Sequence, residues 1–266
     1  MREISNVGEM SEIISVREPF ERRELAQRIL SWTLIPAILV LTVALLYVFV
    51  IARVEPGSMS SRVITPDLLT GMAWEHLKLV LISSGLAIIT AIPAGILITR
   101  SAFRDLAGVF MSIANIGQTV PSIAILGLSM TYLGIGFQPA VFALWIYALL
   151  PILRNTYTGI MEVDPAVIDA ARGMGMTDRQ ILWRIELPLA LSVIFAGIRI
   201  SVVINVGTAA LATFIGVRNL GLPIAAGLRV RRDMMVLAGG VLTAVFAIAM
   251  DFILGKIEAR LVPPSN

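Results

Sequence analysis

Two sets of polar side chains lie inside long apolar runs, and their types suit them to contact water or a polar solute. The sets are Ser201, Asn205 and Thr208, and Asn115, Gln118 and Thr119. The first set has i, i+4, i+7 spacing, which places it on one helical face, away from Ile200 and Ile204. Such groups either line a path for a polar solute or hydrogen-bond neighbouring helices. The residues alone leave both roles open, and we take both sets as candidates for a path.

Other kinds of site find little support in the sequence. It has no cysteine and a single histidine, His76, so thiolate metal sites and the usual histidine clusters are excluded. We find neither a nucleophile–base pair nor a GxxxxGK[ST] phosphate-binding sequence. We therefore expect no catalytic residue, metal or cofactor, and any ATP hydrolysis has to come from a partner chain. Arg199 and Asp251 are charged residues inside apolar runs and could form an ion pair.

The composition indicates an all-α integral membrane protein. Hydrophobic residues make up 57% of the 266 residues and charged residues 15%. Apolar segments near the roughly 20 residues that a helix needs to cross a bilayer predict about six transmembrane helices. They span residues 32–52, 77–99, 106–130, 140–153, 189–211 and 236–254. The spans and their short loops use up the chain, which leaves no room for an ATPase domain.

The distribution of Lys and Arg sets the expected topology. More of them lie on the inner side when the amino terminus is cytoplasmic. Residues 1–31 are then a cytoplasmic tail, residues 160–188 a cytoplasmic loop and residues 257–266 a C-terminal tail. The external segment Arg218–Arg232 departs from this trend. Because the arginines flank apolar segments, the net charge of +3 reflects membrane topology, and we expect no nucleic acid partner.

The loop at residues 160–188 carries signals for two short helices. Asp164 can cap the first helix, and Pro165 suits its first position. Gly175 can take a left-handed conformation just past its end. Thr177 and Gln180 have the spacing of a capping box that opens the second helix.

This loop resembles the EAA loop of ABC importer permeases. The resemblance rests on the spacing of seven residues: Asp169, Ala170, Ala171, Gly175, Ile185, Leu187 and Pro188. The one departure is Asp169, where the family has Glu. The resemblance implies a type I ABC importer permease fold, in which this loop is the coupling helix that docks into a groove of a cytoplasmic ATPase.

A wider resemblance covers about residues 74–260. Gln118-Thr119-Val120-Pro121-Ser122 and the segment Tyr147–Thr156 are similar to permeases of osmoprotectant importers, which carry glycine betaine, carnitine or choline. Residues 72–256 would form the permease domain, and residues 32–52 an additional helix. The segment Gly216–Gly221 departs from the Gly-Ala-Gly-Gly-Leu-Gly stretch common in that family.

Together these features predict the transmembrane subunit of an osmoprotectant ABC importer in the cytoplasmic membrane of a bacterium or archaeon. The implied partners are an ABC ATPase dimer, a second permease subunit (identical or homologous), an external solute-binding protein and membrane lipid. The first alternative is an ABC permease for another small solute, such as an amino acid or an alkylsulfonate. A second is an ion-coupled secondary transporter, which predicts paired intramembrane acids or inverted repeats. A membrane enzyme ranks last.

Overall fold

The computed structural model describes residues 33–49, 52–53, 58 and 62–262, so the expected tail at residues 1–31 lies outside the described part. The chain divides into two compact units, Met1–Tyr47 and Val48–Asn266. The described part of the first unit is most of an apolar helix, Thr33–Phe49, which falls within the expected segment 32–52. This helix is shorter than a typical span.

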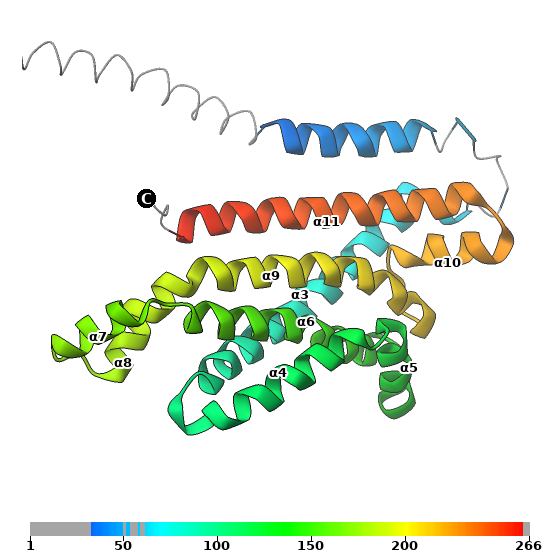
Figure 1. Ribbon diagram of the computed structural model, residues 1–266. Helices are drawn as coiled ribbons and strands as arrows, with labels where there is room; N and C mark the ends of the chain where they lie inside the picture. The colour runs from blue at the N-terminus through cyan, green and yellow to red at the C-terminus, as the bar shows by residue number, and fades with distance from the viewer. Residues whose placement is uncertain (1–32, 50–51, 54–57, 59–61, 263–266) are drawn as a thin grey trace, which may run out of the picture. The chain divides into compact units, whose positions relative to one another are not determined.

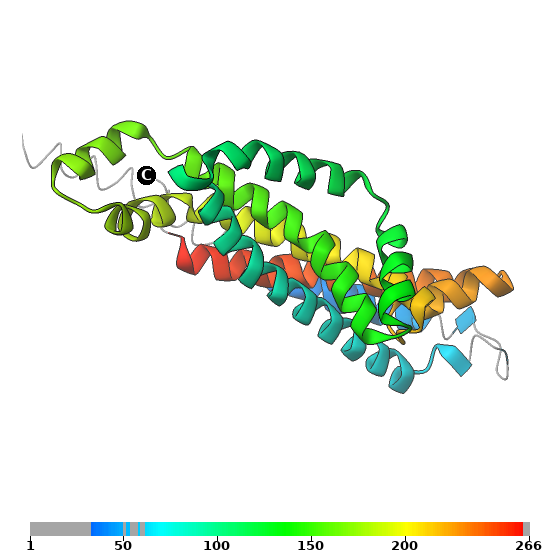
Figure 2. The ribbon, with the colours of Figure 1, turned by 90° about the horizontal axis from the view of Figure 1, so that it is seen from below.

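Every regular element in the described part of the second unit is a helix (Figures 1 and 2). Its α-helices are α3 (Pro66–Ile98), α4 (Arg104–Thr119), α5 (Ser122–Leu133), α6 (Phe137–Met161), α7 (Pro165–Gly173), α8 (Asp178–Ile181), α9 (Leu187–Ala209), α10 (Gly221–Val230) and α11 (Asp233–Leu261). A short 3₁₀ turn, η1 (Ser101–Phe103), precedes α4; a π-helical segment, η2 (Leu182–Glu186), joins α8 to α9; and a 3₁₀ segment, η3 (Ala210–Ile215), follows α9.

The first span of this unit begins earlier than expected. The hydroxyl of Thr65 accepts a hydrogen bond from the Leu68 N–H at 3.3 Å, and Pro66 occupies the first turn of α3. The sequence places Pro66 in an external loop, but a proline in the first helical turn lacks only a donor that has no helical partner there. Part of the expected loop at residues 53–73 is therefore helix.

The expected continuous span at residues 106–130 is wrong, because the chain bends sharply at Pro121. Val120 is extended, with ψ of 126°, and α4 and α5 meet at 98°. Proline disfavours helical geometry in the residue before it and cannot donate its own backbone hydrogen bond. The pair α4–α5 is a broken span or a re-entrant loop.

Three helices, α3, α6 and α9, pack closely at the centre of the second unit. Small residues permit this approach: a Cβ added at Gly95 of α3 would lie 2.7 Å from Thr156 of α6, and one at Gly197 of α9 would lie 2.5 Å from Asn155. α11 packs against α9 and α10. α6 is longer than the expected segment 140–153 and continues through Pro151 to Met161.

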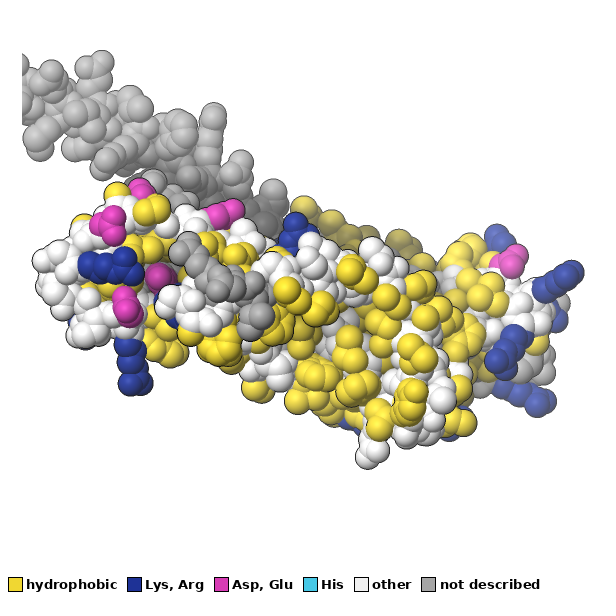
Figure 3. Space-filling view, turned by 60° about the horizontal axis from the view of Figure 1, so that its bottom comes forward, with side chains coloured by type: hydrophobic (Ala, Val, Ile, Leu, Met, Phe, Trp, Pro, Cys, Tyr) yellow, Lys and Arg dark blue, Asp and Glu magenta, His cyan; other side chains and the backbone are white. Residues whose placement is uncertain are grey.

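The surface of the second unit fits a bilayer. In the described residues four helical segments are long and apolar enough to cross a membrane, or five if α4–α5 is one broken span. Figure 3 shows charged side chains at the two ends of this unit and an apolar surface between them. The expected all-α membrane architecture is confirmed.

Candidate functional site

The first candidate site is the two-helix segment α7–α8, which projects at one end of the second unit (Figures 1 and 2). The Asp164 carboxylate accepts a hydrogen bond from the Ala166 N–H at 2.8 Å, and Pro165 is the first residue of α7. The expected cap is therefore confirmed. It satisfies a donor that the first turn of a helix would otherwise leave free.

The turn between α7 and α8 depends on Gly175. Its φ is +80°, and the Met176 N–H donates to the Ala171 carbonyl at 3.1 Å while the Gly175 N–H donates to the Arg172 carbonyl at 2.9 Å. This is the Schellman pattern, which calls for a left-handed residue just past the helix end. An added Cβ at Gly175 would meet no atom within 4 Å, so only backbone strain disfavours a side chain there.

The expected capping box of α8 is also confirmed. The Thr177 hydroxyl accepts a hydrogen bond from the Gln180 N–H at 3.4 Å, and the Thr177 N–H donates to the Gln180 side-chain oxygen at 2.8 Å. Two donors at the helix start are satisfied reciprocally. The turn is thus held at both ends by local contacts.

Apolar side chains are exposed on and near this segment. Ala171 is buried, whereas Asp169 and Ala170 are exposed. Met174 is 75% exposed and Trp183 63% exposed. These two side chains are therefore available for a contact with a partner.

The segment is joined to the spans through η2. The Leu187 N–H bonds to the Leu182 carbonyl five residues back, which is π-helical geometry. Pro188 cannot donate to the Arg184 carbonyl, so the regular α-helical ladder is interrupted here. Glu186 ends this segment and accepts a hydrogen bond from the Arg100 guanidinium at 2.6 Å. The α7–α8 segment is therefore tied, through η2, by an ion pair to the chain just after α3.

The polar residues expected to face a path lie in two settings. Ser201 is buried and donates to the Ala148 carbonyl of α6 at 2.6 Å. Asn205 is buried and donates to the hydroxyls of Ser83 and Ser84 in α3 at 2.8 Å and 2.9 Å. These bonds join helices of the same chain. That Ser201 and Asn205 also line a path for the solute stays a prediction.

Three of the other expected path residues, Thr208, Asn115 and Thr119, form no hydrogen bond with these two among the described residues. Thr208 bonds the Ile204 carbonyl of its own helix at 2.9 Å. In α4, Asn115 is exposed, and Thr119 bonds the Ile116 carbonyl at 2.7 Å. The side chain of Gln118 lies outside the described part. Their roles also stay predictions.

Arg199 of α9 forms an ion-pair cluster with α11. Its guanidinium donates to both carboxylate oxygens of Asp251 at 2.9 Å and 3.1 Å, and to Glu258 at 2.8 Å. The pair with Asp251, which the sequence left open as one possibility, is present, while Glu258 was missed because the sequence reading placed it in a tail. Three charges paired in this way are less costly in an apolar setting than isolated ones.

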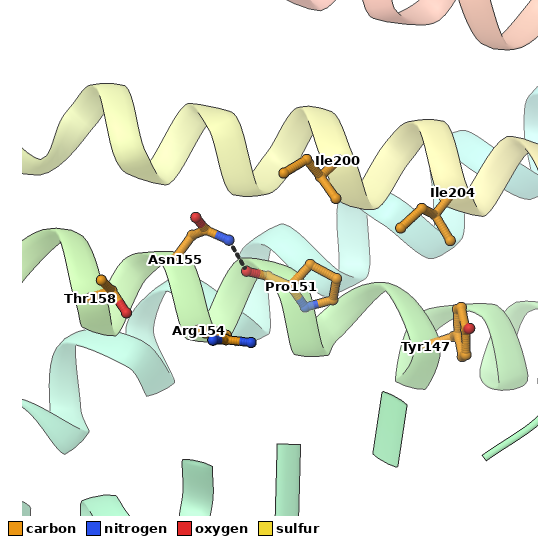
Figure 4. Close-up of a pocket in the computed structure, with 7 residues that line it drawn as sticks. All are labelled: Tyr147, Pro151, Arg154, Asn155, Thr158, Ile200 and Ile204. Carbon is orange, nitrogen blue, oxygen red and sulfur yellow. Dashed lines mark hydrogen bonds between the residues drawn. The ribbon is translucent and has the colours of Figure 1, made fainter. Parts of the chain in front are cut away.

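A cavity of about 550 Å³ lies along one face of α6 beside α9 (Figure 4). It is lined by Tyr147, Pro151, Arg154, Asn155, Thr158, Ile200 and Ile204. Figure 4 shows Ile200 and Ile204 pointing from α9 toward α6, with the Asn155 amide donating to the Pro151 carbonyl at 2.8 Å. None of the lining residues is acidic. The cavity can accept a small solute that carries a negative group.

Sequence reasoning assigned no role to the polar lining residues of α6. Their spacing was a usable signal, since Tyr147, Arg154 and Thr158 recur at helical intervals on one face. Arg154 directly follows the expected segment 140–153 and lies inside α6, two turns before Met161. Ile200 and Ile204, expected away from a path, line the cavity.

Comparison with known protein families gives one match that covers most of the second unit. The model for the family described as "Binding-protein-dependent transport system inner membrane component" matches residues 91–263. That range includes the α7–α8 segment, the cavity and the Arg199 cluster.

Individual proteins agree with that match. The carnitine transport permease protein OpuCB of Listeria monocytogenes is 45% identical over 190 residues, which cover 71% of this chain and 86% of that protein. The glycine betaine/carnitine/choline transport system permease protein OpuCB of Bacillus subtilis is 41% identical over 189 residues, covering 71% and 86%. A chain of the MetNI methionine ABC transporter, solved in inward-facing conformations, aligns with a TM-score of 0.65 at 25% identity, covering 74% of this chain and 97% of that one.

Proposed function

We propose that this chain, which belongs to the family of inner membrane components of binding-protein-dependent transport systems, moves a small osmoprotectant such as glycine betaine, choline or carnitine. The observation that carries this substrate class is the identity above 40% to permeases named for carnitine, choline and glycine betaine. The chain is a transport component of the inner membrane. We place its amino terminus in the cytoplasm.

The α7–α8 segment is the proposed contact with the ATPase. Seven residues would form or position this contact: Asp169, Ala170, Ala171, Gly175, Ile185, Leu187 and Pro188. The exposed Met174 and Trp183 offer apolar area for such a contact, and the Schellman turn at Gly175 fixes its shape. ATP hydrolysis takes place on that partner, and the segment passes its closure to the spans as a rigid-body motion.

A second permease subunit and an external solute-binding protein complete the proposed importer. Much of each span is exposed in the single chain, α11 most of all, so lipid or another subunit has to cover it. The solute then crosses between two permeases. The six polar residues Asn115, Gln118, Thr119, Ser201, Asn205 and Thr208 remain candidates for contacts along that path.

A second candidate substrate is an amino acid. It is favoured by the structural likeness to the MetNI methionine transporter, at 25% identity. The higher identity to the osmoprotectant permeases makes amino acid transport the weaker candidate.

Reconstitution of the assembled transporter tests this function. Proteoliposomes that hold this chain with its ATPase and its binding protein should accumulate radiolabelled carnitine or glycine betaine when ATP is supplied. This chain alone should neither hydrolyse ATP nor concentrate solute. Accumulation of methionine and not of any betaine would reject the osmoprotectant class of substrate. ATP turnover by the single purified chain would reject the assignment of ATP hydrolysis to a partner chain.

A further inference from the structure

The cavity beside α6 carries a cation inside this apolar helix, two turns before the helix ends at Met161. Arg154 lines the cavity, and in the described residues no carboxylate lies within ion-pair distance of it. Arg199 in the neighbouring helix shows the contrast, since it is held by two carboxylates. A charged side chain within a span is costly unless it meets a counter-charge or water. Arg154 is exposed beside the cavity and has no such counter-charge in the described residues, so it is available to a ligand that brings its own negative group.

An aromatic ring stands two helical turns from this cation on the same cavity wall. Tyr147 precedes Arg154 by seven residues, which is roughly 10 Å along the helix axis. The long stem of arginine can close much of that separation. The face of a tyrosine ring attracts quaternary ammonium groups, which cannot donate hydrogen bonds. One wall of the cavity thus offers a partner for each end of a betaine.

We propose that this cavity is a transit site for zwitterions that carry a carboxylate and a quaternary ammonium, with Arg154 binding the carboxylate and the Tyr147 ring contacting the cation. The volume of about 550 Å³ lies in the range of small-molecule sites. Ile200 and Ile204 supply an apolar wall for the methyl groups. The inference rests on the proposed function and adds a discrimination to it: glycine betaine and carnitine fit both partners, whereas choline lacks the carboxylate.

The test measures transport of carnitine and choline by the complete assembly in proteoliposomes, each at saturating loaded binding protein. The binding protein is the same for all variants. A change in the ratio of the carnitine rate to the choline rate, relative to the unaltered chain, therefore reports an effect of the substitution in the permease. Arg154→Gln should lower carnitine transport about tenfold or more, the scale for losing a charge-assisted hydrogen bond, and should leave choline transport within about twofold. Arg154→Lys should recover part of the carnitine rate. Arg229→Gln, in α10 and outside the cavity, is the matched control and should change neither.

The aromatic partner is tested in the same assay. Tyr147→Phe keeps the ring and should keep both rates, while Tyr147→Leu removes the ring and should lower both. Detergent extraction and ATPase copurification establish that each variant assembles. A different role for Arg154, reaching toward lipid headgroups from its span, predicts equal losses for carnitine and choline. An unchanged ratio of the carnitine rate to the choline rate in Arg154→Gln would overturn the proposed binding of the carboxylate by Arg154. Failure of the unaltered assembly to move either solute would instead reject the proposed function.

Discussion

Breaking the ion pair between Arg100 and Glu186 should weaken the link between the α7–α8 segment and the spans. The two side chains meet at 2.6 Å, and they are 30% and 10% exposed. Arg100→Gln leaves the Glu186 carboxylate almost fully buried without its cation. Glu186→Gln leaves the guanidinium, which also bonds the Thr99 hydroxyl and reaches solvent. We therefore expect Arg100→Gln to destabilise the protein more than Glu186→Gln.

The expected loss of unfolding free energy follows from the partial burial of this pair. A hydrogen bond to a charged group contributes about 1.5–3 kcal/mol, and breaking a fully buried pair costs about 3–5 kcal/mol. Because Arg100 is partly exposed, we expect about 2 kcal/mol for Arg100→Gln and a coupling energy of about 1–2 kcal/mol in a double-mutant cycle. The pair Lys78–Glu75 is a matched control, with the same 2.6 Å separation but 38% and 39% exposure. Exposed pairs contribute about 0–1 kcal/mol.

The cycle is measured by reversible unfolding of the purified chain in mixed micelles, together with solute uptake per ATP hydrolysed by the assembled transporter. Variants of the Arg100 pair should hydrolyse ATP with less uptake per ATP, because motion of α7–α8 reaches α3 less directly. Variants of Lys78 and Glu75 should keep the normal ratio. Coupling energies that agree within about 0.3 kcal/mol for the two pairs, with an unchanged uptake ratio, would refute this reasoning.

Three further substitutions probe other contacts. Gly175→Val should abolish uptake while the protein still inserts, because φ of +80° strains a β-branched residue, and Gly175→Asn should retain more uptake since Asn tolerates this region; normal uptake by the valine variant would count against the coupling role. Asn205→Ala should lower the free energy of unfolding by about 1 kcal/mol, the scale of two interhelical hydrogen bonds in a membrane, with uptake largely kept; lost uptake at unchanged stability would instead place Asn205 on the path. Gly197→Ala should lower the free energy of unfolding by about 1–3 kcal/mol, because its Cβ would lie 2.5 Å from Asn155. Gly85→Ala is the control in the same unfolding measurement. Its Cβ would meet no atom within 4 Å, so it should be neutral or stabilising.

The local geometry of the α7–α8 segment could be predicted from the sequence almost in full. The Asp164 cap, the turn at Gly175 and the Thr177–Gln180 box each depend on residues within a few positions of one another. Such contacts form wherever the local backbone allows them, so local sequence determines them. The fold class followed from composition, because only helices satisfy their backbone hydrogen bonds within a single apolar segment.

Only the tertiary structure decided which neighbour each face of a span contacts. Helical periodicity shows that Ile200 and Ser201 point in different directions, but it does not say that α6 receives the serine or that the cavity receives the isoleucine. The second carboxylate on Arg199 belongs to a residue 59 positions further along the chain. These placements depend on how whole helices pack, because every span is apolar on most of its surface and its sequence distinguishes lipid-facing from protein-facing sides only weakly. The sequence by itself therefore determined the fold class and the turn at Gly175, and the packing of the helices decided where the cavity lies.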